Sequence, residues 1–360
     1  MNAIKVFFGK RGAGMVRTTG FPKRNEGQGE PIIDPELPIV DAHHHLFDRP
    51  ALRYMLDDYR KHADSGHNVV GTVYVETQAM ARTNGPNVMK AIGEVEFANG
   101  VAAICASGVY GPRRVAAAIV GFADMTLGAG IAPFLDRAMA VAPERFRGVR
   151  QIALAHPDSE VLQFLTHKPP ADLLKSSAFG VALAELEKRG LSFDATVLHP
   201  QLPELATIAD AYPDVTFVMD HMGLATAAER SPHARAEAFQ EWRGVVHDLA
   251  RRPNVVCKVG GLGTSYWGFD FYLSDEPVTS AELAKVWAPY VETVLDAFGF
   301  DRCMAESNFP NDGRSAGFVP LWNALKLCVS GASATEKAAL FHGTAIRIYR
   351  MDLPEALLAE

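Results

Sequence analysis

Three consecutive histidines follow a short apolar run near the start of the chain, in the sequence PIVDAHHHLFDRP. Because the side chains of a β-strand alternate between its two faces, we expect His43 and His45 to lie on one side and His44 on the other. His44 should then pack or hydrogen-bond in the wall of strands. Two imidazoles on one face could share a metal ion, or each could bond to a backbone carbonyl in a structural role.

Other polar side chains stand at the ends of later apolar runs. Glu76 ends the run NVVGTVYVET, Arg150 ends FRGVR, and His199 and His221 close two further runs. Neutral imidazole is a good zinc ligand, and a catalytic zinc site keeps one position open for water. An arginine at a strand end could clamp a carboxylate, although a lone arginine is more often a structural ion-pair partner. The histidines together favour a metal site.

The elements that must position these residues follow a regular alternation of short apolar runs and amphipathic stretches. Several runs are continuous in Val and Ile, which is typical of strands buried on both faces. The eight runs span residues 37–45, 68–77, 115–125, 145–153, 191–198, 215–221, 254–262 and 301–310. Helical spacing of apolar residues is found over 85–101, 202–212, 234–252 and 281–299. Pro203 and Ser231 suit helix starts.

This alternation predicts an α/β protein built as a single (β/α)8 TIM barrel, closed by a helix over 335–351. A doubly wound open sheet would instead carry a Gly-rich phosphate-binding turn after its first strand, where this chain has histidines. We expect an N-terminal extended arm over 1–37, the barrel over 38–350 and a C-terminal tail over 351–360. Barrel enzymes place their active sites at the C-terminal ends of the strands, which would bring the polar strand ends together.

Composition excludes several classes of partner. The chain has 360 residues and a net charge of −7, with Lys and Arg scattered, so it lacks the basic stripe that nucleic acid requires. No apolar run approaches the ~18 residues of a membrane span. The four cysteines are widely spaced without a CxxC pair, which is typical of reduced thiols in a cytoplasmic protein.

The segments VDAHHHLFD, FRGVRQ, LSFDATVLHPQL, FVMDHMG, NVVCKVGGL and CMAESNFPNDG occur in this order along the chain. In combination they resemble the amidohydrolase superfamily, in the amidohydrolase-2 branch of TIM-barrel hydrolases that includes pyrone-dicarboxylate, fuconate and sulfomuconate lactonases. The resemblance implies one barrel, hydrolysis of a small ester-like bond, and one divalent metal ion in many members. Zinc is the expected ion and manganese the alternative, while some lactonases of this branch are thought to work without metal.

The resemblance also implies roles for single residues. His43 and His45 match the HxH motif of the first strand, and His199 and His221 match the histidines of the fifth and sixth strands. Asn308 falls where the superfamily usually has an aspartate that acts as general base and often as metal ligand. An amide cannot accept a proton, so another carboxylate would have to replace it.

Three carboxylates are candidates for that replacement. Glu76 is the first choice because it ends a strand beside the first strand; Glu306 and Asp312 are the alternatives. Glu76 could also be a structural partner of a lysine or arginine in the barrel wall. We therefore name Glu76, Asn308 and His221 as candidate catalytic residues.

The mechanism that we expect is opening of a small, anionic lactone by a metal-activated water. His43, His45 and His199 would hold the metal, and His221 would hydrogen-bond the water or the developing oxyanion. Arg150 would grip a substrate anion. Tyr266 and Trp267, in the Gly-rich segment 260–277, would cover the substrate or else pack against a second subunit of a homo-oligomer. A zinc-dependent decarboxylase of an aromatic or muconate-type acid and a non-catalytic binding barrel are the alternatives.

Overall fold

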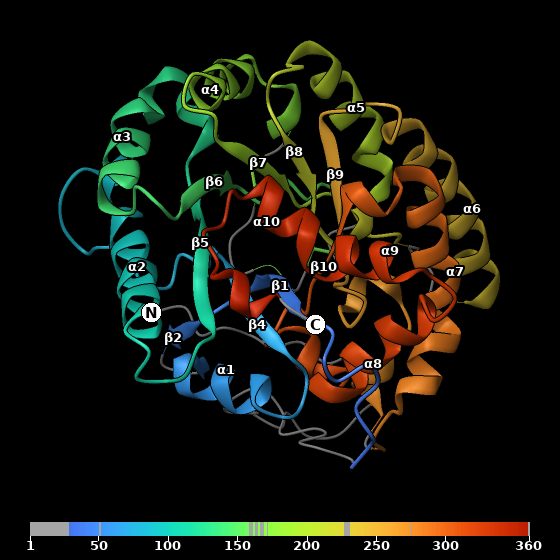
Figure 1. Cartoon of the computed structure of the whole chain (residues 1–360). Helices are drawn as coiled ribbons and strands as arrows, with labels where there is room; N and C mark the ends of the chain where they lie inside the picture. Colours follow the sequence, from blue (N-terminus) through green and yellow to red (C-terminus); the bar gives the residue numbers. More distant parts are fainter. Residues whose placement is uncertain are drawn as a thin grey trace, which may run out of the picture.

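The computed structural model describes residues 29–49, 52–157, 161–162, 165, 169–170, 172–226, 231–274 and 276–358. Eight parallel strands form one sheet in the order β1-β4-β5-β6-β7-β8-β9-β10. Their bounds are β1 Ile39–His44, β4 Val69–Val75, β5 Arg114–Phe122, β6 Phe146–Arg150, β7 Ser192–Ala195, β8 Phe217–Met219, β9 Val255–Val259 and β10 Cys303–Ala305. Seven strands lie within their apolar runs and β5 begins one residue before its run, and the sheet curls into the predicted (β/α)8 barrel (Figure 1).

The barrel closes between the first and the last strand, beyond the regular end of β10. His44 and Phe309 form an isolated parallel bridge there. The Asn308 amide donates to the His43 carbonyl at 2.9 Å, and the His45 amide donates to the Phe309 carbonyl at 2.8 Å. The segment that carries the histidines is therefore joined through its backbone to the segment that follows β10.

A ring of helices surrounds the strands, as Figure 1 shows. Their bounds are α1 Leu56–Ala63, α2 Ile92–Ala106, α3 Ala132–Val141, α4 Ser177–Glu187, α5 Leu202–Ala211, α6 Pro232–Leu249, α7 Ser280–Phe298, α8 Phe318–Cys328, α9 Ala334–Ala338 and α10 Thr344–Ile348. The predicted helix starts are confirmed: Pro203 lies in the first turn of α5, and the Ser231 side chain caps α6 by accepting from the Ala234 amide.

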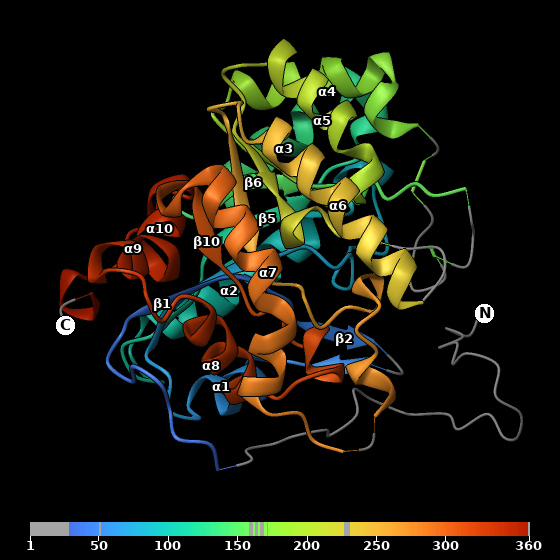
Figure 2. The ribbon, with the colours of Figure 1, turned by 90° about the vertical axis from the view of Figure 1, so that its right-hand side faces the viewer.

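The closing helix predicted over 335–351 is broken into α9, a short π-helical turn over Ala339–Gly343, and α10. In Figure 2, α9 and α10 lie at one end of the barrel, and the hairpin of β2 (Phe47–Arg49) and β3 (Leu52–Tyr54) lies at the other. Tyr349, Met351 and Leu353 pack against the apolar interior of the barrel. The C-terminal segment therefore plugs the end of the barrel opposite to the hairpin.

Side-chain alternation along the strands creates two apolar layers. One lies inside the barrel and includes Val40, Ala42, Val218, Val256 and Met304. The other lies between strands and helices and holds residues one position away along the same strands. Because side chains two positions apart share a face, the residues that follow the inner apolar layer also point inward, and several of these are charged.

Residues 1–28 of the predicted N-terminal arm lie outside the described residues. The described remainder is held on α8: the Ile33 amide donates to Asn323 at 2.9 Å, and Lys326 Nζ donates to the carbonyls of Ile33 and Asp34 at 2.7 and 2.8 Å. None of the helices in the part of the chain that the structure describes is both long and apolar enough to cross a membrane.

Candidate active site

The three histidines of β1 separate as the strand alternation predicts. The rings of His43 and His45 are nearly perpendicular, at an interplanar angle of 82°, with Nε2 atoms 3.1 Å apart, and both side chains are buried. His44 turns into the wall, where it bonds to Thr72 at 2.8 Å and packs on the Tyr59 ring. The expectation that His44 serves the barrel wall is therefore confirmed.

The hydrogen bonds of His45 fix its chemical form. Its Nδ1 lies 2.9 Å from the Val75 carbonyl, which can only accept, so Nδ1 carries the ring proton. Burial is the main cause that lowers the pKa of His45 well below its usual value, and His43 and Arg150 add to the shift. The neutral ring then presents the lone pair of Nε2 to His43, where either a proton or a metal ion can join the two rings.

The last four strands of the barrel direct a cluster of charged side chains toward His43. Asp194 lies on β7 and Lys258 on β9, while Asp220 and Glu306 directly follow β8 and β10. All four are fully buried. The sequence interpretation assigned no role to Asp194, Asp220 or Lys258. The sequence did contain a signal for such residues. Asp220 and Lys258 are single charged residues two positions after Val218 and Val256, so they share the inward face of their strands.

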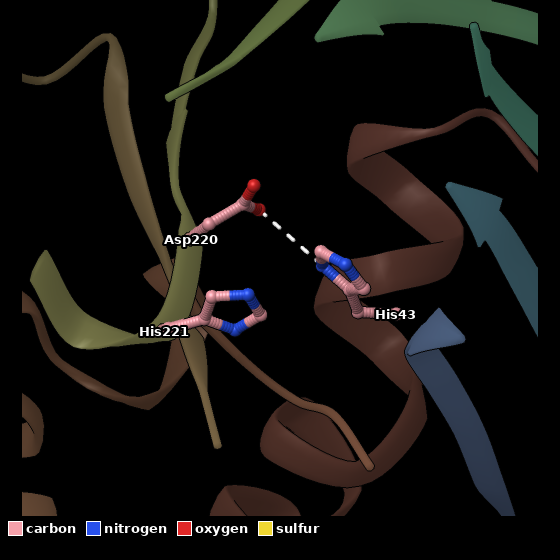
Figure 3. Close-up of side chains that lie close together, drawn as sticks. All are labelled: His43, Asp220 and His221. Carbon is pink, nitrogen blue, oxygen red and sulfur yellow. Dashed lines mark ion pairs between the residues drawn. The ribbon is translucent and has the colours of Figure 1, made fainter. Parts of the chain in front are cut away.

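Asp220, His43 and His221 form the one group of three candidate metal ligands found among the described residues. Figure 3 shows the Asp220 carboxylate directed at the His43 ring, with His221 beside it; Asp220 Oδ1 lies 3.5 Å from His43 Nδ1. His221 Nδ1 lies 2.6 Å from Glu306 Oε1, so this carboxylate orients the ring. Asp220 Oδ1 and Glu306 Oε2 are also buried, and their nearest partners are Lys258 Nζ at 3.0 Å and His43 Nδ1 at 3.1 Å.

The charged groups in this cluster shift one another's pKa values. Burial would raise the pKa of Glu306, but His221 and His43 outweigh it and lower that pKa to about 2. Burial likewise opposes a proton on His221, but Glu306 and Asp220 hold the pKa of His221 above its usual value. Burial and the neighbouring Lys258 lower the pKa of His43, although Asp220 and Glu306 oppose the shift. The carboxylates therefore favour a proton on His221 but not on His43.

Glu76 and Arg150 form a buried pair with each other. Arg150 Nε donates to Glu76 Oε1 at 2.9 Å, and its NH2 group donates to the Glu76 carbonyl at 2.7 Å. The third nitrogen lies 3.2 Å from His43 Nε2. The structural alternative considered for Glu76 is thus the arrangement observed. The guanidinium expected to clamp a substrate anion is engaged by protein groups instead.

Burial raises the pKa of Glu76 to about 7, with Arg150 opposing the shift. A carboxylate with this pKa could still exchange a proton near neutral pH. The roles of Glu76 as base and of Arg150 as anion clamp stay predictions, and the pairing weighs against the second.

Asn308 turns away from the histidines. Its backbone adopts a left-handed conformation with φ of 49°, and its side-chain amide donates to Asp312 Oδ1 at 2.7 Å. The other Asp312 oxygen accepts from the Gly263 amide at 2.8 Å. Asn308 and Asp312 therefore join the segment after β10 to the segment after β9. Of the three carboxylates considered as replacements for the usual aspartate, only Glu306 contacts His43 and His221.

His199 lies apart from the pair formed by His43 and His45. The strand β7 ends at Ala195, and His199 begins a short 3-10 turn before α5. The Thr226 amide donates to His199 Nδ1 at 3.2 Å, and Glu241 Oε2 lies 3.6 Å from Nε2. A neutral ring that accepts at Nδ1 carries its proton on Nε2, which disfavours metal ligation there. The structure brings His221 rather than His199 to His43.

The aromatic residue Trp267, which follows β9, packs against neighbouring helices instead of lying at the surface. Trp267 is 3% exposed, donates its indole N–H to the Gly261 carbonyl at 3.0 Å, and stacks on Phe269. Its ring also contacts Trp242 of α6 and Tyr290 of α7. Tyr266 is partly buried beside it. We expected Trp267 to contact substrate, but its indole belongs to the packing between this segment and two helices.

The fold and the cluster together define a TIM barrel with buried histidines and carboxylates at the C-terminal ends of its strands. The amidohydrolase family Amidohydro_2 matches residues 40–351, and the chain belongs to this family. The resemblance drawn from the sequence motifs is therefore confirmed.

The individual relatives have a sequence identity to this chain below 30%. An uncharacterized protein of Sinorhizobium fredii is 29% identical over 330 residues, covering 88% of this chain and 99% of its own. An L-fucono-1,5-lactonase of Burkholderia ambifaria is 29% identical over 242 residues, covering 66% of this chain and 72% of its own. A zinc-bound amidohydrolase structure from Burkholderia multivorans has a TM-score of 0.67 at 22% identity, covering 87% and 99%.

Proposed function

We infer that this enzyme of the amidohydrolase family opens a small lactone by attack of water at a divalent metal centre. The observation that carries this proposal is the pair of imidazoles His43 and His45, whose Nε2 atoms face each other beside a cluster of buried carboxylates. The name of the lactonase relative from Burkholderia ambifaria supports the reaction class, and the zinc of the structural relative supports the choice of ion.

The residues present fit a divalent ion. The Nε2 atoms of His43 and His45 lie 3.1 Å apart, close enough that both would be able to hold the same divalent ion. If His43 Nε2 is a ligand, its ring proton must reside on Nδ1. Glu306 Oε2 lies 3.1 Å from that nitrogen and otherwise lacks a hydrogen bond. A carboxylate on the far nitrogen of a ligating histidine is the usual arrangement.

When bound, a divalent ion lowers the pKa of a water ligand from 15.7 toward about 7, which supplies hydroxide at neutral pH. The protein's own contribution is the orientation of the groups around the reacting carbonyl. His221 is held by Glu306 through Nδ1, so its Nε2 is the atom that can hydrogen-bond the water or the oxyanion. Asp220 holds His43 from the other side.

Arg150 is the residue that the sequence analysis expects to recognise a charge on the lactone. Arg150 uses its Nε and one amino group on Glu76, so its bidentate fork does not face an anionic substrate. We therefore propose the lactone ring as the substrate feature and test anionic and neutral lactones side by side.

The test begins with protein stripped of metal by a chelator. Zinc or manganese is restored, and a panel of anionic and neutral lactones is followed by the acid released to a pH indicator. We expect metal-dependent turnover in the wild type, none in H43A/H45A, and full turnover in H247A, whose histidine is only partly buried on α6. Release of CO2 from an aromatic or muconate-type acid, without lactone opening, would make the protein a decarboxylase. Metal binding without any turnover would favour a binding barrel.

A further inference from the structure

The strand β1 contains one residue more than its neighbour β4 between two pairs of their register. Asp41 pairs with Thr72, and His44 pairs with Tyr74. Two residues of β1 therefore lie opposite the single residue Val73 of β4. Such an extra residue is a β-bulge, which bends a strand and redirects side chains, and bulges are common next to active sites.

This bulge decides which histidines point into the barrel. Val40 and Ala42 belong to the inner apolar layer, so an unbroken alternation along β1 would direct His44 inward and His43 into the wall. The structure shows the reverse: His43 approaches His45 inside the barrel, and His44 bonds in the wall. Alternation within the three histidines is kept, but the bulge shifts it by one residue relative to the start of β1.

The side chain of Asp41 fastens this bulge to the rest of the barrel wall. Its Oδ1 accepts from the backbone amides of His43 at 3.3 Å and Ser307 at 2.8 Å. Its Oδ2 accepts from the hydroxyls of Ser307 at 2.6 Å and of Tyr59, on α1, at 2.9 Å. Asp41 is 0% exposed. An ionised carboxylate only accepts hydrogen bonds and has about four acceptor positions, which matches these four donors.

We propose that Asp41 is a positioning residue that stabilises the bulge of β1 and thereby directs His43 and His45 into the active site. This inference rests on the proposed function and deepens it by naming the residue that orients the two histidines. Asp41 acts through the backbone and does not touch the substrate. Without its carboxylate, two buried amides lose an acceptor, so the bulge is destabilised relative to regular pairing, in which His43 would lie opposite Tyr74 and face outward.

The first experiment locates the histidine rings without any substrate. Crystal structures of the wild type, D41A and D41N are compared under the same conditions. In D41A we expect the His43 ring to turn toward the barrel wall and to lose its contact with His45. In D41N we expect both rings to keep their places, because the side-chain oxygen still accepts from the two backbone amides and the hydroxyls can turn to accept from the NH2 group.

Glu94 provides a matched control for the loss of a buried carboxylate. It is 1% exposed and accepts from the Tyr74 hydroxyl at 2.8 Å and from the amides of Thr77 and Gln78 at 2.7 and 3.0 Å. E94A should therefore lower the urea midpoint about as much as D41A, while the two histidine rings stay paired. If E94A separates the rings to the same extent, general loosening of the barrel explains the effect and the proposal is wrong.

Kinetics add a second measurement on the same variants. Displacement of a catalytic group by about 1 Å can cost ~10²-fold in turnover, so D41A should lower kcat by this factor at nearly unchanged KM, and D41N should recover most of the loss. A folded D41A that keeps His43 beside His45 would overturn the proposal, whatever its activity. The ring positions do not depend on lactone turnover, so a failed lactone panel and a failed role of Asp41 remain distinguishable.

Hydrogen exchange on the wild type decides the matter if D41A does not fold. The amide of His43 lies in the bulge and donates to Asp41, so it should exchange as slowly as the paired amides of β1. Exchange at the rate of exposed loops would show that Asp41 does not hold the bulge.

Discussion

Gly261 allows a direct test of how the backbone after β9 positions His221. Its φ is +66°, and a Cβ added there would lie 2.4 Å from His221 Nδ1 and 2.5 Å from two carbons of the same side chain. Such a contact is impossible without movement of the ring. Because Nδ1 also lies 2.6 Å from Glu306 Oε1, G261A should displace His221 from its orienting carboxylate.

The loss of folding stability in G261A can be compared with that in a matched control, G190A. A left-handed conformation costs an alanine about 1–2 kcal/mol. Gly190 also has a positive φ, of +61°, but an added Cβ would meet nothing within 4 Å. G190A should therefore lose only that conformational energy. G261A should lose a further 1–3 kcal/mol or so from overpacking, about 2–5 kcal/mol in total.

Urea denaturation of both variants gives the free energies of unfolding, and the lactone assay gives kcat. Displacement of a catalytic group by about 1 Å can cost ~10²-fold in turnover, which we expect for G261A and not for G190A. The reasoning is refuted if G261A is no less stable than G190A and turns over at the wild-type rate.

Three further predictions follow from the site and the core. The double variant H43A/H45A should bind no metal while keeping its circular dichroism spectrum; unchanged metal content would mean that these are not the ligands. E76Q removes the nearest negative charge from the buried Arg150 guanidinium, which keeps only Asp220 Oδ2 at 3.8 Å, and should cost up to about 3–5 kcal/mol in urea denaturation, whereas lost turnover at unchanged stability would support a role as base. Burial and Lys326 lower the pKa of His67 to about 3, so the unfolded chain takes up a proton first as the pH falls below 6.5. Stability present above pH 6.5 is therefore lost below it, by about 2 kcal/mol at pH ~5, and H67Q should show a correspondingly smaller loss.

The barrel could be predicted because its signals are local. Runs of Val and Ile mark strands that are covered on both faces, and the spacing of apolar residues in α6 and α7 marks helices within a single segment. The alternation of His43, His44 and His45 is equally local, and it placed all three rings correctly. What could not be predicted are contacts that depend on the register between strands. Glu76 and Arg150 are 74 residues apart, and their strands are not even neighbours in the sheet.

The surroundings of His199 and Trp267 show the same limit. His199 follows the run that contains β7, but the strand ends at Ala195, so the ring falls in a turn that faces α6. Trp267 appeared to belong to a mobile cover over the substrate because of the glycines around it. Its packing on Trp242 and Tyr290 depends on α6 and α7, the helices that precede and follow this segment. Neither outcome is encoded in the residues next to His199 or Trp267.

The strand β10, which precedes Asn308, explains why this position carries an amide instead of a carboxylate. Met304 points into the barrel, so the side chain two positions later, Glu306, points inward as well and faces His43 and His221. The chain then turns through the left-handed conformation of Asn308, which directs that amide to Asp312. An aspartate at 308 in this conformation would place its negative charge against Asp312 instead of the histidines. We therefore propose that Glu306, two residues earlier, supplies the carboxylate that the centre requires, and that the neutral amide is the group that the turn can accept.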